Sequence, residues 1–297
     1  MKRLIPIALS LLLCLPLKAQ TDSVRIGIAL CGGAARGYVH IGVLQAIDEA
    51  GLELDVVSGT SMGAIIGLFY SAGYTPMEIL DMVKRHRMDH TKHIVRNNRK
   101  RDAGFADYAF LRRIIYRYMP HNHFDSLQTQ FYCCVTDLNR GKSSYIGHGP
   151  LLAQYVTASA SVPFLFSPVI IEGTTYVDGC VLNDIPIEPL LMEHCDITLG
   201  SYLLQDTIAG RFDKRNEIWS RIVSLYMSSN IIDRLPLFDY LIPNNLHGLE
   251  AFDFDKVDAL VGYGYEAAKA VLRDTPELRK LCSTPFPEPQ RRKRPEE

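Results

Sequence analysis

The sequence predicts an α/β fold with a mainly parallel sheet covered by helices on both faces. Short apolar runs rich in β-branched residues alternate with longer segments that carry apolar residues at helical spacing. Of the 297 residues, 47% are hydrophobic and 22% are charged, as in an ordinary globular protein. Alternating strands and helices are typical of parallel sheets, because each crossover helix lies on one face of the sheet.

The individual elements follow from the positions of apolar runs, glycines and prolines. Predicted strands lie at residues 24–30, 56–58, 131–136, 144–146, 169–171, 174–177 and 196–203. Predicted helices lie at residues 40–50, 62–72, 149–158, 185–192 and 257–272, and a further one begins at Pro76. Gly51 and Gly73 end the first two helices.

Both ends of the chain differ from this central part. Residues 1–19 have the layout of a secretory signal peptide, with Lys2 and Arg3 before an apolar run. The run is shorter than the ~20 apolar residues of a membrane span, and an uncleaved anchor is the alternative. Proline and charge in residues 283–297 predict a disordered tail. We expect one domain at residues 20–282 and an exported bacterial protein that is periplasmic, outer-membrane-associated or secreted.

A basic stretch with histidines interrupts the α/β pattern. Residues 84–101 read KRHRMDHTKHIVRNNRKR, within a basic insert expected at about 84–125. The stretch is interpreted as a solvated helix or loop, and contact with an anionic membrane surface is the functional alternative. A lid over the active site is a further hypothesis. The net charge of −1 gives no reason to expect nucleic acid as a partner.

Residues 56–63 read VVSGTSMG and place a serine between two glycines at a strand-to-helix turn. This is the nucleophile-elbow pattern, in which Gly59 and Gly63 let neighbouring backbone pass close to Ser61. The helix after Ser61 directs free N–H groups at a developing oxyanion. A small-residue turn that only packs is the alternative for this motif alone.

The glycine-rich segment at residues 32–37, GGAARG, follows the first strand and can bind an anion with backbone N–H groups. A dinucleotide site with Glu53 or Asp55 on the ribose is one interpretation, although Ala34 breaks the G-x-G-x-x-G pattern. An oxyanion hole that serves Ser61 is the other. Parallel strands that end side by side bring both loops to one crevice.

The third motif, YVDGC at residues 176–180, ends a predicted strand with an aspartate followed by glycine. Asp178 is therefore a candidate base at the sheet edge. A simple turn aspartate is the commoner case for an Asp-Gly pair.

Together, ALCGGAARGYVHIGVLQAIDEAG, VSGTSMGAIIGLFYSAGY and YVDGCVLNDIP resemble the patatin-like phospholipases over roughly residues 24–196. The resemblance implies a three-layer α/β/α fold and lipid acyl hydrolase activity through a Ser–Asp dyad and an acyl-enzyme. It implies that Ser61 is the nucleophile and Asp178 the base. It assigns the oxyanion hole to Gly32, Gly33 and Ala34, and motif support to Arg36, Gly37, Gly59, Gly63 and Gly179.

Two departures from the family pattern concern residues near the site. Ala34 stands where the family most often has glycine, and Cys180 where glycine or alanine is usual. Asn183 and Pro186 match the segment that usually follows the aspartate.

No metal or organic cofactor is implied. The seven cysteines show no metal-ligand spacing, and mostly buried free thiols are expected.

Other function classes remain open on the sequence. Ser61, Asp178 and His194 have the chain order of a Ser–His–Asp esterase, although His194 and His40 are more often structural in such positions. The same acyl-enzyme would serve an acyltransferase. A non-catalytic lipid- or nucleotide-binding module is the third alternative. The expected partner is a lipid or ester substrate, and the oligomeric state is not predicted.

Overall fold

The computed structural model describes residues 24–88, 109–204, 231–246 and 248–284, with single residues at 213, 218, 221 and 225. The predicted signal peptide, residues 89–101 of the basic stretch and residues 285–297 of the predicted tail lie outside the described residues. No helix among the described residues is both long enough and apolar enough to cross a bilayer.

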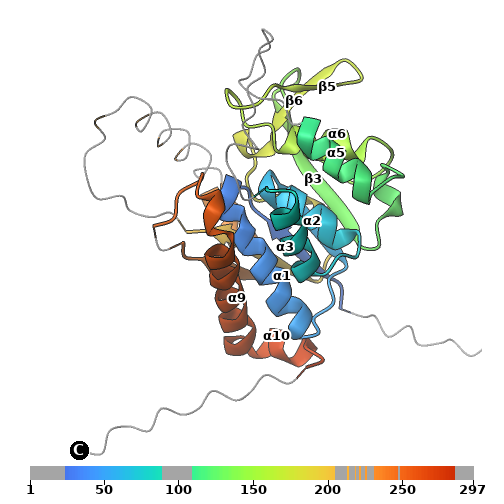
Figure 1. Cartoon of the computed structure of the whole chain (residues 1–297). Coiled ribbons are helices and arrows are strands. Elements are labelled where there is room, and N and C mark those ends of the chain that lie inside the picture. The colour runs from blue at the N-terminus through green and yellow to red at the C-terminus, as the bar shows by residue number, and fades with distance from the viewer. Residues whose placement is uncertain are drawn as a thin grey trace, which may run out of the picture.

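One eight-stranded sheet organises the described chain (Figure 1). Its order is β5-β6-β3-β2-β1-β7-β8, and β4 also pairs with β3. The strands are β1 Ile26–Leu30, β2 Val56–Thr60, β3 Gln130–Asp137, β4 Lys142–Ile146, β5 Val169–Ile171, β6 Thr174–Asp178, β7 Ile197–Leu203 and β8 Tyr240–Asn244. Strands β3, β2, β1, β7 and β8 are parallel, whereas β4, β5 and β6 join through antiparallel pairs. The expected mainly parallel centre is confirmed.

Helices lie on both faces of the sheet and produce the three layers. They are α1 Val39–Glu49, α2 Met62–Ser71, α3 Pro76–Arg85, α5 Ala109–Tyr118, α6 Leu152–Ser159, α7 Glu188–Met192, α9 Val257–Asp274 and α10 Pro276–Leu281. Figure 1 shows α1, α2, α3 and α9 together on one side. Gly67 of α2 packs near Leu30, while a Cβ on Gly27 would meet Leu190 of α7. Because residues 27 and 30 of a strand point to opposite faces, α7 covers the other side.

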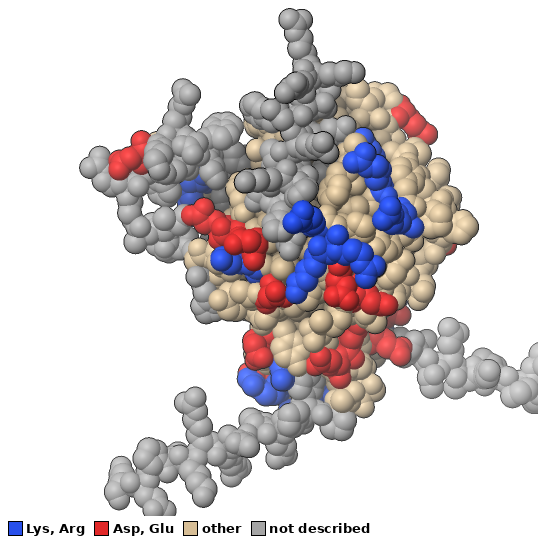
Figure 2. Space-filling model, in the orientation of Figure 1, with Lys and Arg blue, Asp and Glu red and all other residues tan. Residues whose placement is uncertain are grey.

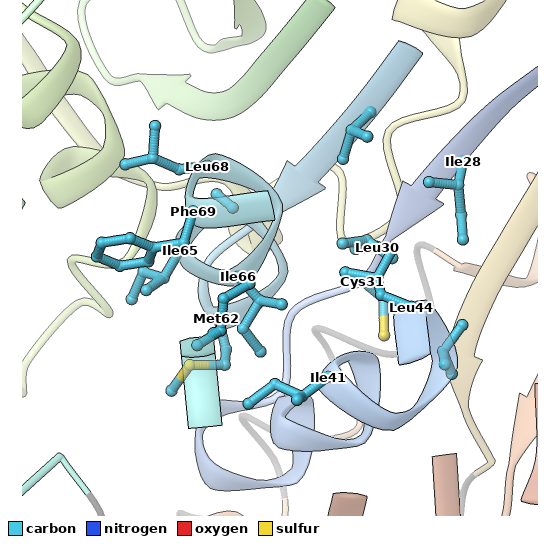
Figure 3. Packing of buried hydrophobic residues seen from close by; sticks show 14 of the residues in the cluster. Ile28, Leu30, Cys31, Ile41, Leu44, Met62, Ile65, Ile66, Leu68 and Phe69 are labelled. Atoms are coloured by element: carbon cyan, nitrogen blue, oxygen red, sulfur yellow. The ribbon is translucent and has the colours of Figure 1, made fainter. Parts of the chain in front are cut away.

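The main hydrophobic core lies between the sheet and the first two helices. Figure 3 shows Ile28 and Leu30 of β1 beside Ile41 and Leu44 of α1 and a cluster from α2. Every residue of α2 except Tyr70 is buried, so the helix is fixed tightly against β1 and β2. This packing determines where the first residue of α2, and the serine before it, are held.

Several elements differ from the sequence-based expectation. Strand β8 and helices α5 and α10 were not predicted individually, and α5 falls inside the segment expected to be a basic insert. Helix α5 buries Leu111, Ile114 and Ile115 and packs against α6, so this part of the segment belongs to the fold. The chain at Ser283 and Thr284 donates backbone hydrogen bonds to residues 51 and 50.

Candidate active site

Ser61 occupies a sharp turn between β2, which ends at Thr60, and α2, which begins at Met62. Its backbone has φ 54° and ψ −119°, a conformation that residues with a side chain rarely adopt. Such strain persists only where the surroundings hold it, and it is often found at functional sites. Ser61 therefore has the backbone conformation of neither the strand before it nor the helix after it, as the nucleophile-elbow pattern predicts.

The two flanking glycines are required by close backbone contacts. A Cβ on Gly59 would lie 2.5 Å from the carbonyl oxygen of Gly63, and a Cβ on Gly63 would lie 2.3 Å from that of Leu30. Real Cβ atoms do not approach backbone oxygen so closely, so any larger residue would move the elbow. The glycine spacing read from the sequence thus has a steric cause.

Asp178 reaches Ser61 directly. The Ser61 hydroxyl donates a 2.7 Å hydrogen bond to Oδ2 of Asp178, and the backbone N–H of Cys180 donates to Oδ1 at 3.0 Å. The sheet explains this contact: β3 pairs with β2 on one side and with β6 on the other. Asp178 ends β6 and therefore lies near the carboxyl end of β2.

Burial changes the acidity of this carboxyl. Asp178 is fully buried, and removal from water raises its pKa to about 6, although the hydrogen bonds from Cys180 and Ser61 oppose the rise. Ser61 is itself only 5% exposed. A carboxylate with this pKa is a stronger proton acceptor than an exposed aspartate.

The glycine-rich loop lies against the serine. The N–H of Gly32 donates to Asp184 through its side-chain Oδ1 at 3.0 Å and its carbonyl at 3.2 Å. Within the described part of the chain, the amide N–H groups of Gly33 and Ala34 donate to no protein acceptor. Ala34 has φ 51°, so alanine adopts here the left-handed conformation that glycine favours. Of the three amides predicted for the oxyanion hole, Gly32 is already engaged.

Residues 28–191 match the family model described as patatin-like phospholipase, which covers more than half of the chain. The chain belongs to this family. A lysophospholipase nte1 of Emericella nidulans is 28% identical over 203 residues, which are 66% of this chain and 13% of that protein. A lysophospholipase nte1 of Aspergillus fumigatus is 24% identical over 292 residues, covering 89% of this chain and 19% of that protein.

Bacterial relatives and a solved structure extend the comparison. An uncharacterized NTE family protein of Mycobacterium tuberculosis is 29% identical over 191 residues, 61% of this chain and 49% of that protein. This patatin-like chain thus spans at most about half the length of the curated relatives named here. VipD from Legionella pneumophila matches 85% of this chain and 67% of its own, with TM-score 0.49 and 16% identity.

Ser159 was not foreseen from the sequence. In this patatin-like chain its hydroxyl oxygen accepts the N–H of Ser61 at 3.0 Å and donates to the carbonyl of Cys134 at 2.6 Å. It therefore ties the elbow to α6 and β3. Ser159 lies in a run of small residues, TASAS, such as occurs at many helix ends. No sequence pattern indicated that it contacts the nucleophile.

The segment that follows Asp178 is hydrogen-bonded to β2, the strand that ends just before Ser61. Ser58 donates to the carbonyl of Pro186 at 2.6 Å, and Thr60 donates to that of Asn183 at 3.0 Å. A Cβ on Gly179 would lie 2.3 Å from the carbonyl oxygen of Cys134, so this glycine permits close passage of β3. Cys180 is buried and leaves the contact between Asp178 and Ser61 intact.

Arg36 and Gly37 lie in the short helix η1 Ala34–Tyr38. Arg36 Nε donates to the carbonyl of Gly33 at 3.5 Å, which supports the loop from within. A Cβ on Gly37 would lie 2.7 Å from Cβ of Met62, so this glycine lets the loop approach α2.

The residues of the competing interpretations lie elsewhere. His194 and Asp55 adjoin the amino ends of β7 and β1, where Asp55 accepts the N–H of Ile26 at 2.7 Å. Ser61 and the glycine-rich loop lie at the carboxyl ends of parallel strands, at the opposite edge of the sheet. Neither a histidine relay through His194 nor a ribose contact by Asp55 fits this geometry. No group of His, Cys, Asp or Glu among the described residues is arranged to hold a metal ion.

A small apolar hollow begins one residue after the serine. Side chains from η1, α2, α3 and the residues after α3 line it: Tyr38, Met62, Ile65, Ile66, Phe69, Ile79, Met82, Val83 and Met88. Tyr38 and Phe69 thus line this hollow, whereas the hydroxyl of Tyr70 donates a hydrogen bond to Asp48. The described cysteines are all free thiols.

Proposed function

We propose that this patatin-like protein is a serine lipid acyl hydrolase of the phospholipase A, lysophospholipase or esterase type, with Ser61 as nucleophile and Asp178 as base. The observation that carries the proposal is the 2.7 Å hydrogen bond from the Ser61 hydroxyl to the buried Asp178 carboxylate. A nucleophile within hydrogen-bond reach of its base is the arrangement that covalent catalysis requires.

The reaction follows from these contacts. Asp178 Oδ2 takes the proton of Ser61 as Oγ bonds to the carbonyl carbon of the ester, and the carbonyl oxygen becomes an oxyanion. When this intermediate collapses, the ester C–O bond breaks, and Asp178 gives its proton to the leaving alcohol. Water then attacks the acyl-enzyme, again losing a proton to Asp178, which returns it to Ser61 as the fatty acid departs.

The oxyanion donors we propose are the amides of Gly33 and Ala34, aided by the N-terminus of α2. Backbone N–H groups held in place before the reaction stabilise charge without reorganising. Gly32 lies beside the nucleophile, since a Cβ on it would be 3.2 Å from Cβ of Ser61. Its own N–H is directed to Asp184, so its part in this scheme is to hold the loop.

The apolar hollow next to Met62 has room for little more than one water-sized group, so we propose that its lining side chains move to admit the first carbons of an acyl chain. Its lining is entirely hydrophobic apart from the Tyr38 hydroxyl, which donates to the carbonyl of Met88. The names of the fungal relatives indicate lysophospholipids as a first substrate class to test. Transfer of the acyl group to an acceptor other than water uses the same acyl-enzyme.

The test compares wild type with Ser61→Ala and Asp178→Asn. Each protein is incubated with p-nitrophenyl acyl esters and with mixed phospholipid and lysophospholipid vesicles, and released fatty acid is identified by mass spectrometry. We expect release by wild type alone. Hydrolysis by either folded variant at the wild-type rate would contradict the dyad, and transfer to an added alcohol without free acid would favour the acyltransferase.

We also propose that the protein is exported and contacts an anionic membrane surface. Lys84, Arg85 and Arg87 are exposed at the end of α3, and Arg113 and Arg117 on α5. Figure 2 shows Lys and Arg side chains gathered over these two helices. Clustered basic side chains bind anionic headgroups. Charge reversal of Arg113 and Arg117 should reduce sedimentation with anionic vesicles, and unchanged sedimentation would contradict the membrane contact.

A further inference from the structure

Asp184 is a second buried carboxyl at the site, and the proposed reaction gives it no part. It is 7% exposed and its Oδ1 accepts the N–H of Gly32 at 3.0 Å. A Cβ on Gly32 would lie 2.5 Å from this oxygen and 3.2 Å from Cβ of Ser61. The Asp184 carboxyl therefore lies beside the nucleophile and contacts the loop that carries the proposed oxyanion donors.

The opposite end of the same peptide unit is held by His40. Its Nε2 lies 2.9 Å from the carbonyl oxygen of Cys31, and its Nδ1 lies 2.9 Å from Oγ of Ser201. A carbonyl only accepts, so Nε2 carries the hydrogen and Nδ1 accepts from the Ser201 hydroxyl. Burial lowers the pKa of His40 to about 4, so this ring stays neutral near pH 7. Near pH 7, the Cys31–Gly32 peptide unit therefore has a neutral imidazole at its carbonyl oxygen and a carboxyl that can change charge at its N–H.

We propose that Asp184 is a positioning residue for ester hydrolysis: its carboxyl group fixes the first amide of the glycine-rich loop, and its ionisation slows the reaction by placing negative charge beside the forming oxyanion. This inference rests on the proposed function. A neutral carboxyl keeps Oδ1 as an acceptor for the Gly32 N–H, so protonation removes the charge without releasing the loop.

The groups that act on Asp184 come from several separate parts of the chain. Asp178 ends β6, Arg36 lies in η1, and the thiols of Cys31 and Cys180 flank the carboxyl. Burial, followed by the charge of Asp178, raises the pKa of Asp184 to about 7, and the Gly32 N–H and Arg36 oppose the rise. Burial also raises the pKa of both thiols well above the usual range, so they remain neutral.

Two interacting carboxyls therefore titrate near neutrality, and the apparent values belong to the pair. The form with highest activity has Asp178 ionised, to accept the Ser61 proton, and Asp184 protonated, to leave the oxyanion site without added charge. As the pH rises, activity should first increase as the pair loses its first proton, near pH 6, and then decrease as it loses its second, near pH 7. The two limbs give a bell-shaped profile.

The test measures kcat/KM for a p-nitrophenyl ester from about pH 5 to 9, following fatty acid release. Wild type should show both limbs. Asp184→Asn keeps an oxygen for the Gly32 N–H, so it should retain the rise near pH 6, lose the alkaline decrease, and exceed wild type about tenfold at high pH. Asp137→Asn, a matched change at a buried carboxyl of β3 that pairs with Arg140, should keep the wild-type profile.

An alkaline decrease in Asp184→Asn with the wild-type midpoint and depth would overturn the proposal. Infrared titration of the carboxyl band, comparing wild type with Asp184→Asn, supplies a readout that needs no turnover. A carboxyl band that titrates above about pH 6 and is absent from the variant supports the proposed effect of the Asp184 charge on the reaction. A band that titrates below about pH 5 refutes it. If Ser61→Ala hydrolyses esters as wild type does, the proposed function fails separately from this inference.

Discussion

Replacing Asp178 with asparagine should abolish hydrolysis and stabilise the fold at the same time. Burial raises the pKa of this carboxyl to about 6 from its ordinary ~3.9, so its ionisation costs the folded state about 3 kcal/mol. The pKa of Asp178 is higher in the folded protein than in the unfolded chain. The contribution of the neutral Asp178 carboxyl to stability is therefore fully present below about pH 4 and is lost as the pH rises through about 6.

Urea unfolding at two pH values measures this effect. At about pH 8 we expect Asp178→Asn to exceed wild type by about 3 kcal/mol, and at about pH 4 by less than ~1 kcal/mol. Asp137→Asn is the control, and it should lower the free energy of unfolding at about pH 8 instead of raising it. The reason is that the contact with Arg140 holds the pKa of Asp137 below its usual value, so the ionised carboxylate stabilises the fold. A variant no more stable than wild type at the higher pH, or equally favoured at both, would refute the reasoning.

Two further changes test the elbow and a helix cap. Gly63→Ala would place its Cβ 2.3 Å from the carbonyl oxygen of Leu30, so we expect about 2–5 kcal/mol of destabilisation and loss of hydrolysis. Gly262→Ala, in an open and exposed position of α9, should instead stabilise by about 0.5–1 kcal/mol, and equal effects would refute the steric argument. Thr75→Ala removes the capping box that Thr75 forms with Glu78 and should cost about 1 kcal/mol in urea unfolding, with hydrolysis unchanged. Lost hydrolysis in a folded Thr75→Ala protein would contradict that purely local role.

Local sequence patterns were sufficient to locate the elbow and the aspartate. The Gly-x-Ser-x-Gly spacing around Ser61 reflects backbone contacts that only glycine permits, and Asp178 is the last residue of a clear strand. Both signals lie within a few residues along the chain. The pairing of β6 with β3, which makes the two side chains meet, depends on the whole sheet.

The parts that escaped prediction depend on contacts distant in sequence. Ser159 and Asp184 bond to amides 98 and 152 residues away, and neither lies in a distinctive pattern of its own. Strand β8 contains Pro243, which argues against a strand when read alone, yet β8 lies at the edge of the sheet beside β7. Helix α5 has three arginines in ten residues, and its buried stripe was hidden within the basic segment.

The most direct test of the central claim is to locate the acyl group during turnover. Wild type is mixed rapidly with a p-nitrophenyl acyl ester, quenched in acid and digested, and the peptide that contains residue 61 is examined by mass spectrometry. An acyl mass on Ser61 in wild type, absent from Ser61→Ala, is the expected result. An acyl group on another residue, or turnover that persists without Ser61, would contradict the proposed role of the serine and its aspartate.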